Sequence, residues 1–277
     1  MILVIGGRSK IGSALIEELV ARGETVRALA RGASEAQFAA GVETVTGDLA
    51  DPGSLRAAMA GVEKVFLLSS PHRDAVAWHR NAVDAAREAG VGLLVRSSIL
   101  GADGDVAAEF IRAHAESDRY LRESWLDHAI VRPNLFLQNV PESTIPSIDA
   151  DGNFYVNAGD ARISMVDTRD VAAVAAVVLT GGAASGAVYE VTGPQALSYA
   201  DVAARLSASL GRPVRYVDAP DDAVRDALLG FGLDPWFAGA LVGLYQEYRR
   251  GYGSEVTDTV ERLTGRPPRS LDDLLAP

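Results

Sequence analysis

Cysteine is absent from this 277-residue chain, and lysine occurs only twice, as Lys10 and Lys64. The lack of cysteine excludes disulfides, thiolate metal ligands and cysteine nucleophiles. The lack of lysine beyond position 64 excludes a catalytic lysine from the middle of the chain. Only four histidines occur, none of them in a His-x-x-x-His or His-x-His pair, so we expect no metal site. The Gly-x-Ser-x-Gly motif of many hydrolases is absent too.

The chain also has fewer positive than negative charges and lacks long apolar runs. The formal net charge is -11, which argues against a surface that follows nucleic-acid phosphates. No apolar run approaches the roughly 20 residues that cross a bilayer. The start of the chain, where Ile2 to Ile5 lead at once into Gly6, is unlike a signal peptide. We therefore expect a cytoplasmic monomer or homodimer that binds a small molecule.

The pattern of the first 132 residues indicates the class of fold. Short β-branched apolar runs at 2–5, 25–30, 42–46, 64–69, 92–97 and 128–132 alternate with alanine-rich helical stretches. The first helical stretch carries Ile11, Leu15 and Leu19 at i, i+4 and i+8, which is one apolar stripe facing a sheet. This alternation predicts an α/β protein with a doubly wound, Rossmann-type parallel sheet.

The alternation weakens after Pro133, where prolines and glycines punctuate a less regular stretch. Further on we expect helices over 168–179 and 199–210, a strand over 188–191, and an aromatic helical tail from 221. We predict a Rossmann domain over 1–140, to which 155–192 returns, and a smaller, partly interleaved substrate-binding region over 141–277. Three roles stay open for the tail: the roof of a substrate cleft, a contact between copies, or core.

A glycine-rich turn joins the first strand to the first helix. In that context the amides and the dipole of the helix N-terminus face a pyrophosphate. Ser9 stands where the usual middle glycine would be. Its side chain either narrows the space in which a pyrophosphate approaches the backbone or adds a hydroxyl donor. The glycines could equally serve a tight turn with no ligand. We predict that the whole turn binds the cofactor, namely Gly6, Gly7, Arg8, Ser9, Lys10, Ile11 and Gly12.

The end of the second strand bears on the choice of dinucleotide. NAD-specific proteins place an acidic residue there to bind the ribose 2′-hydroxyl. This chain has Ala30 and Arg31 instead. The guanidinium of Arg31 suits a 2′-phosphate, with Arg8 and Lys10 as further positive charge, although Arg31 could also be a solvated loop residue. We therefore predict NADP(H) as the cofactor.

Several stretches together resemble one family, the NmrA-like atypical short-chain dehydrogenases, which are NAD(P)H-binding proteins related to quinone reductases and azoreductases. The resemblance covers nearly the whole chain. The matching stretches are Val4–Gly12, Val26–Arg31, Gly47–Pro52, Val65–Ser70, Ser97–Ala102, Arg132–Asn134, Val166–Ala172, Thr192–Pro194 and Leu263–Arg269.

The resemblance implies two further cofactor contacts. Asp48 and Leu49 would contact the adenine, and Leu68, Ser69 and Ser70 would form a wall on the nicotinamide side. Each position also has a purely structural interpretation. Asp48 could hold a turn, because aspartate commonly starts turns, and the two serines could simply end a strand.

The chain departs from ordinary short-chain dehydrogenases in its catalytic residues. Those enzymes use a Tyr-x-x-x-Lys pair, and here His114 and Asp118 align with that pair, four residues apart on one face of an expected helix. An imidazole titrates near neutrality, so His114 could relay a proton while Asp118 orients it. Alternatively, both residues could make surface contacts only. Ser98 could bind the substrate or simply end the fifth strand.

The substrate should lie beyond the carboxyl ends of the strands, near Asn134, Phe136 and Asn139. We predict an NADPH-dependent oxidoreductase that reduces a quinone, imine, azo compound or conjugated carbonyl, because such acceptors need little help from a strong fixed acid. Two alternatives stay open. One is a non-catalytic sensor of NADP(H) of the NmrA type, and the other is a non-redox enzyme that keeps the cofactor bound.

Overall fold

Seven parallel strands form the main sheet, as the alternating pattern predicts. The computed structural model describes residues 1–32, 38–103, 106–181 and 185–276. The strand order is β3-β2-β1-β4-β5-β6-β8. The strands are β1 (Ile2–Ile5), β2 (Val26–Ala30), β3 (Glu43–Thr46), β4 (Lys64–Leu67), β5 (Leu93–Ser97), β6 (His128–Pro133) and β8 (Ala187–Val191). All six neighbouring pairs are parallel, so the strands end at one common edge.

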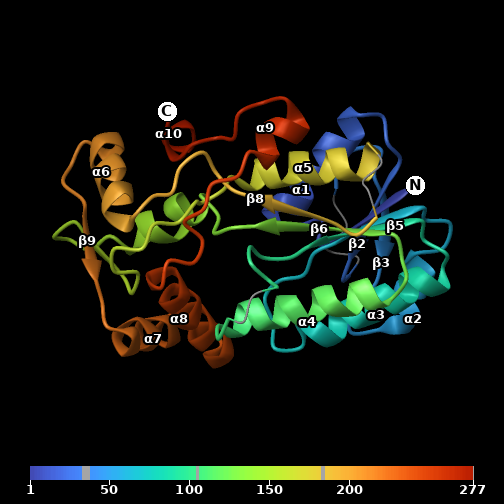
Figure 1. Ribbon diagram of the computed structural model, residues 1–277, viewed down its shortest axis with the longest axis horizontal. Coiled ribbons are helices and arrows are strands. Elements are labelled where there is room, and N and C mark those ends of the chain that lie inside the picture. The colour runs from blue at the N-terminus through green and yellow to red at the C-terminus, as the bar shows by residue number, and fades with distance from the viewer. Residues whose placement is uncertain (33–37, 104–105, 182–184, 277) are drawn as a thin grey trace.

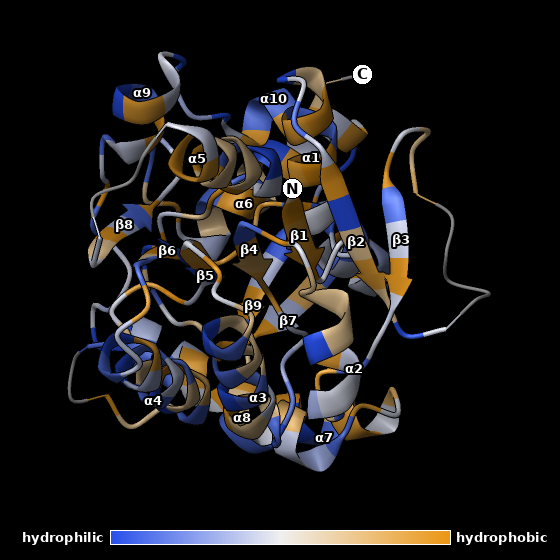
Figure 2. Cartoon of the chain, turned by 90° about the vertical axis from the view of Figure 1, so that its right-hand side faces the viewer, coloured by the Kyte–Doolittle hydropathy of each residue, from blue (hydrophilic) through white to orange (hydrophobic). Residues whose placement is uncertain are grey.

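Helices cover both faces of this sheet, which confirms the doubly wound fold (Figure 1). One layer contains α1 (Lys10–Ala21), α5 (Thr168–Thr180) and α9 (Thr259–Thr264). The other contains α2 (Pro52–Ala58), α3 (Ala75–Glu88) and α4 (Glu109–Glu123). The expected stripe of Ile11, Leu15 and Leu19 is buried in the core beneath α1. Figure 2 shows that the central strands β1 and β4 are predominantly hydrophobic.

A second, smaller assembly lies beyond the carboxyl ends of the strands. Its elements are the paired strands β7 (Asn153–Val156) and β9 (Arg215–Asp218), with α6 (Tyr199–Leu210), α7 (Asp221–Gly230), α8 (Pro235–Arg249) and α10 (Leu271–Leu275). A π-helical turn, η2 (Val140–Thr144), and a 3-10 turn, η3 (Ile145–Ser147), lead into it. Apart from α7, which has no buried residue, these elements share a hydrophobic core that is distinct from the two clusters packed on the sheet.

Local signals in the sequence place the ends of helices correctly. Ser198 and Asp201 form the expected capping box at the start of α6, with each side chain bonded to the other residue's backbone. Gly211 ends the same helix with a φ of 64°, a left-handed conformation that glycine adopts without steric cost. Of the three open roles of the tail, the structure shows core for Tyr245 and Tyr248, which fill the smaller core, while Trp236 lines a surface pocket and its role over a substrate stays a prediction.

No helix within the described part of the chain is long and apolar enough to cross a membrane.

Candidate active site

The glycine turn between β1 and α1 is held in a tight conformation by the backbone itself. A Cβ atom on Gly12 would lie 2.1 Å from the carbonyl oxygen of Gly6, so no larger residue fits. A Cβ on Gly6 would lie 2.6 Å from the carbonyl oxygen of Leu68, which shows how closely the turn approaches the end of β4. Ser9 caps α1, its hydroxyl oxygen accepting from the Gly12 amide at 3.0 Å. The glycines therefore serve the turn and keep side chains away from the helix N-terminus.

Three basic residues lie near this turn, and the structure gives them different surroundings. Arg31 is exposed directly after β2, and Arg8 is exposed within the turn. Lys10 instead pairs with Glu142 of η2. The turn fits a pyrophosphate. The amides in the first turn of a helix have no intrahelical partners, and the glycines place no side chain in front of them.

Asp48 follows β3, at the same edge of the sheet. Its carboxylate accepts from the amide of Ala50 at 2.8 Å, which is the turn-holding role that local sequence chemistry allows. Its own amide donates to the Ser54 hydroxyl oxygen at 2.9 Å. Leu49 packs against the core under the helices, and its carbonyl accepts from Asn81 at 2.9 Å. Contacts of Asp48 and Leu49 with an adenine stay a prediction.

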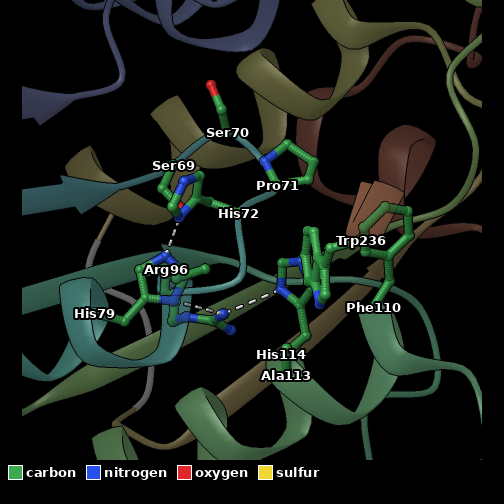
Figure 3. A pocket seen from close by; sticks show the side chains of 11 residues that line it. Ser69, Ser70, Pro71, His72, His79, Arg96, Phe110, Ala113, His114 and Trp236 are labelled. Atoms are coloured by element: carbon green, nitrogen blue, oxygen red, sulfur yellow. Dashed lines mark hydrogen bonds between the residues drawn. The ribbon is translucent and has the colours of Figure 1, made fainter. Parts of the chain in front are cut away.

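A pocket opens beyond β4, beside the glycine turn (Figure 3). Its wall combines the segment after β4 with side chains from α3, β5, α4 and the start of α8. The lining residues are Ser69, Ser70, Pro71, His72, Ala75, His79, Arg96, Phe110, Ala113, His114 and Trp236. The ring of Phe110 meets that of Trp236 edge-on, with centroids 5.5 Å apart. The pocket thus joins two aromatic side chains to three imidazoles.

Arg96 is the centre of the polar groups in this pocket, although it was not among the predicted site residues. It stands in β5 and its side chain is fully buried. One terminal nitrogen, Nη1, pairs with Asp118 of α4. The other, Nη2, lies 3.1 Å from Nδ1 of His79 and 3.0 Å from Nδ1 of His114. A single guanidinium therefore touches two imidazoles and a carboxylate.

The structure connects His114 and Asp118 differently from the sequence-based expectation. The carboxylate of Asp118 is fully buried, and its Oδ2 accepts from the Ser98 hydroxyl at 2.9 Å and from Arg132 Nη2 at 3.2 Å. Its other oxygen is engaged by Arg96. Asp118 thus positions Arg96, and Arg96 in turn touches His114. The hydroxyl of Ser98 is directed at this carboxylate, behind the pocket.

The environment also corrects the expected titration of His114. Removal of its ring from water lowers the pKa of His114 well below the usual value, and the positive charge of Arg96 lowers it further. The pKa of His79 is lowered in the same way, by burial first and then by Arg96 and His114. Both imidazoles are therefore neutral at neutral pH, and His114 is not an imidazolium acid there.

His79 links this network to the predicted nicotinamide wall. Its Nε2 lies 2.9 Å from the hydroxyl oxygen of Ser69, just after β4. His79 was not among the residues predicted for the site. A signal did exist for Arg96, since a charged residue within the apolar run Leu93-Leu94-Val95-Arg96-Ser97 has to find a buried partner.

The three residues predicted to face the substrate lie outside the lining of this pocket. Asn134 is buried, with its amide nitrogen bonded to Ser164 and to the Gly253 carbonyl, and its amide oxygen accepting from Tyr248. Both hydrogens of its side-chain amide are donated within the protein, and the bond to Gly253 holds the C-terminal segment in place. The substrate roles of Phe136 and Asn139 stay predictions.

Comparisons with known proteins agree with this arrangement. A family model described as NAD(P)H-binding matches residues 6–181. The NAD(P)H azoreductase of Xenophilus azovorans is 39% identical over 273 residues, covering 98% of this chain and 95% of the relative.

Solved structures extend the agreement to the whole fold. The NADPH-dependent quinone oxidoreductase of Escherichia coli, complexed with NADPH, superposes with a TM-score of 0.91 at 28% identity, over 100% of this chain and 99% of that one. The negative transcriptional regulator NmrA shares the fold, with a TM-score of 0.80 at 19% identity, over 99% of this chain and 94% of that one. The resemblance seen in the sequence is confirmed, and the chain belongs to the NAD(P)H-binding family of NmrA-like atypical short-chain dehydrogenases.

Proposed function

We propose that this protein is an NADPH-dependent reductase of a small, flat organic acceptor. The observation that carries the proposal is the close approach of the glycine turn to Leu68 at the end of β4, since a dinucleotide bound at this turn would lie beside the aromatic pocket that begins at Ser69. The names of the azoreductase and quinone oxidoreductase relatives support the same class of reaction. An oxidoreductase of this family needs those two sites to be adjacent.

Residues at the carboxyl ends of the first strands would hold the dinucleotide. The turn from Gly6 to Gly12 would receive the pyrophosphate, and Arg31 would bind a 2′-phosphate at the end of β2. Leu68, Ser69 and Ser70 would lie along the nicotinamide. When bound, the reduced dinucleotide supplies a hydride.

The pocket would hold the acceptor. Phe110 and Trp236 offer apolar faces to a flat molecule, and His114 offers a polar edge. The sequence contains no Tyr-x-x-x-Lys pair, so acceptors that yield weakly basic anions suit this pocket better than simple ketones. Quinones, imines, azo compounds and conjugated carbonyls meet that requirement.

We also propose that residues 1–140, joined by 155–192, form the cofactor-binding region, and that 141–277 form a smaller substrate-binding region. The separate hydrophobic core around α6 and α8 supports this division. Within the returning segment, α5 and β8 pack with the main sheet, whereas Tyr155 and Val156 belong to β7 of the small sheet.

The test follows NADPH absorbance while a panel of acceptors from these four classes is supplied. We expect turnover with at least one class, together with saturable dinucleotide binding measured by calorimetry. Tight binding of NADPH with no turnover across the panel would instead favour a sensor of the NADP(H) ratio. Absence of dinucleotide binding would reject both functions.

A further inference from the structure

The guanidinium of Arg96 determines where the imidazole of His114 carries its hydrogen. An arginine nitrogen only donates hydrogen bonds, so an imidazole nitrogen that is bonded to it accepts. Nη2 lies 3.0 Å from Nδ1 of His114 and 3.1 Å from Nδ1 of His79. Nδ1 of His114 therefore presents a lone pair, and the neutral ring carries its hydrogen on Nε2.

This tautomer gives the pocket a hydrogen-bond donor. Nε2 of His114 lies on the side of the ring away from Arg96, where His114 forms part of the pocket wall (Figure 3). Nδ1 of His79 has a second neighbour, the hydroxyl oxygen of Ser117 at 3.1 Å, and that hydroxyl donates to the Ala113 carbonyl at 2.9 Å. Arg96 alone does not set the tautomer of His79, so the inference is drawn for His114.

The charges around the pocket favour an acceptor without positive charge. Among the described residues, no aspartate or glutamate lines the pocket, whereas Arg96 does. The nearest buried carboxylate, Asp118, is already engaged by Arg96 and Arg132. At the rim, Glu109 accepts a bond from Nε1 of Trp236. A cationic acceptor would find no carboxylate in the wall to balance it, and would face a buried guanidinium.

We propose that Arg96 fixes His114 as a neutral hydrogen-bond donor, so that the pocket selects uncharged acceptors with an exposed lone pair, such as a quinone oxygen or an azo nitrogen, over cationic acceptors. This inference rests on the proposed function. Addition of a hydride to a quinone, with the reduced dinucleotide as reductant, turns one carbonyl oxygen into an anion that collects a proton from water. His114 stabilises that anion through its Nε2–H and keeps its own proton.

The direct test is ¹⁵N NMR of the histidine side chains in the whole protein, without cofactor and with NADP⁺. The His114 signals are assigned by their loss in H114Q. We expect a neutral ring with its hydrogen on Nε2 between about pH 6 and pH 8. An imidazolium in that range, or a hydrogen on Nδ1, would overturn the proposal without any measurement of turnover.

Arg96→Lys tests the positioning role, because one ammonium cannot donate to both rings and Asp118 in the same geometry. We expect the Nδ1–H form of His114 to appear in this variant. If circular dichroism shows that R96K does not fold, the spectrum of the unaltered protein decides the question. A folded R96K protein with an unchanged His114 tautomer would contradict the role given to Arg96.

A matched pair of variants tests the donor. Glutamine at position 114 places an amide hydrogen near the position of Nε2, whereas asparagine does not reach it. With a naphthoquinone as acceptor, we expect H114N to lower kcat/KM by about a hundredfold, and H114Q to recover about tenfold of that loss. Equal losses in both variants would remove the donor role.

The substrate class is tested by comparing the naphthoquinone with a cationic triarylmethane dye of similar breadth. We expect kcat/KM to favour the quinone by at least about tenfold, since the cation would lie near the Arg96 guanidinium with no carboxylate in the pocket wall to pair with it. A preference for the cation would reject this inference but leave the reductase function intact. No oxidation of NADPH with any acceptor would reject the proposed function instead.

Discussion

Gly12 is the position in the turn where the backbone leaves no space for a side chain. A Cβ there would lie 2.1 Å from the Gly6 oxygen and 2.7 Å from the Gly7 Cα, and both are backbone atoms that cannot move aside. We predict that Gly12→Ala lowers the free energy of unfolding by about 2–3 kcal/mol, as overpacking does elsewhere. Thermal unfolding monitored by circular dichroism measures this loss.

The control for that variant is Gly239→Ala, on the exposed face of α8. A Cβ at Gly239 meets nothing within 4 Å, and its φ is not in the left-handed region. Alanine is the better helix former, so this change should raise stability by about 0.5–1 kcal/mol. If Gly12→Ala were as stable as the unaltered protein, the turn would have more freedom than the structure indicates.

The two buried histidines predict how stability depends on pH. Burial lowers the pKa of His79 and of His114 below the value of about 6.5 expected in the unfolded chain. Below that pH the unfolded chain binds protons that the folded protein does not, so acidification favours unfolding. We predict that stability is constant above about pH 7 and declines as the pH falls from 6.5, by up to about 1.4 kcal/mol per pH unit for each histidine.

Urea denaturation from pH 8 down to pH 5 measures this decline, and substitution of both histidines by glutamine should make it shallower. Replacement of His79 alone should reduce the slope by an intermediate amount, because His114 is left in place. A slope that is identical in all three proteins would mean that neither His79 nor His114 is kept neutral by the fold.

At the scale of elements, the strands of the main sheet were the part of the fold most fully predicted from the sequence. All six strands expected in the first half are present, because each is a local apolar run bounded by turn residues. The glycine turn and Arg31 were equally visible, since each is defined by its position directly after a strand. The helix capped by Ser198 follows the same local logic.

Only part of the polar group in the pocket could be predicted from the sequence, because the group forms through the packing of separate elements. His79 on α3, Arg96 on β5 and His114 on α4 meet only once those elements are packed together. The sequence indicates that His114 and Asp118 share a helix face. It cannot indicate that a guanidinium from a strand lies between them, or that burial and this guanidinium lower the pKa of His114.

The position of Arg31 at the end of β2 predicts how a substitution there changes the affinity for NADPH relative to NADH. If it binds the 2′-phosphate, Arg31→Ala should raise the Kd for NADPH by about tenfold or more, because a charge-assisted hydrogen bond contributes about 1.5–3 kcal/mol. The Kd for NADH should change much less. Arg22→Ala, which removes an exposed charge that pairs with Glu18 within α1, is the control. Equal effects of Arg31→Ala on both dinucleotides would remove Arg31 from the specificity site.

At the scale of the whole molecule, the C-terminal region completes the wall of the pocket. Asp234 and Trp236, at the start of α8, contact residues far away in the sequence. Nε1 of Trp236 bonds to Glu109 at the start of α4, and Arg73 donates to Asp234 at 3.0 Å. The indole ring then packs edge-on against Phe110. The pocket lining therefore combines Ser69 and Ser70, after β4, with Trp236 from the C-terminal region.

If the dinucleotide lies along Ser69 and Ser70 and the acceptor against Trp236, a change at Trp236 should weaken binding of the acceptor and leave binding of the dinucleotide unchanged. We expect Trp236→Ala to raise the KM for a naphthoquinone by about tenfold, since an aromatic contact of this kind contributes about 1–2 kcal/mol, while the Kd for NADPH stays unchanged. Phe231→Ala is the matched control. Phe231 directly follows α7, its side chain is 77% exposed, and it does not line the pocket. Steady-state kinetics and calorimetry separate the two effects. If the Trp236 variant lost dinucleotide affinity as well, α8 would contribute to the cofactor site, and the two walls could no longer be treated as independent.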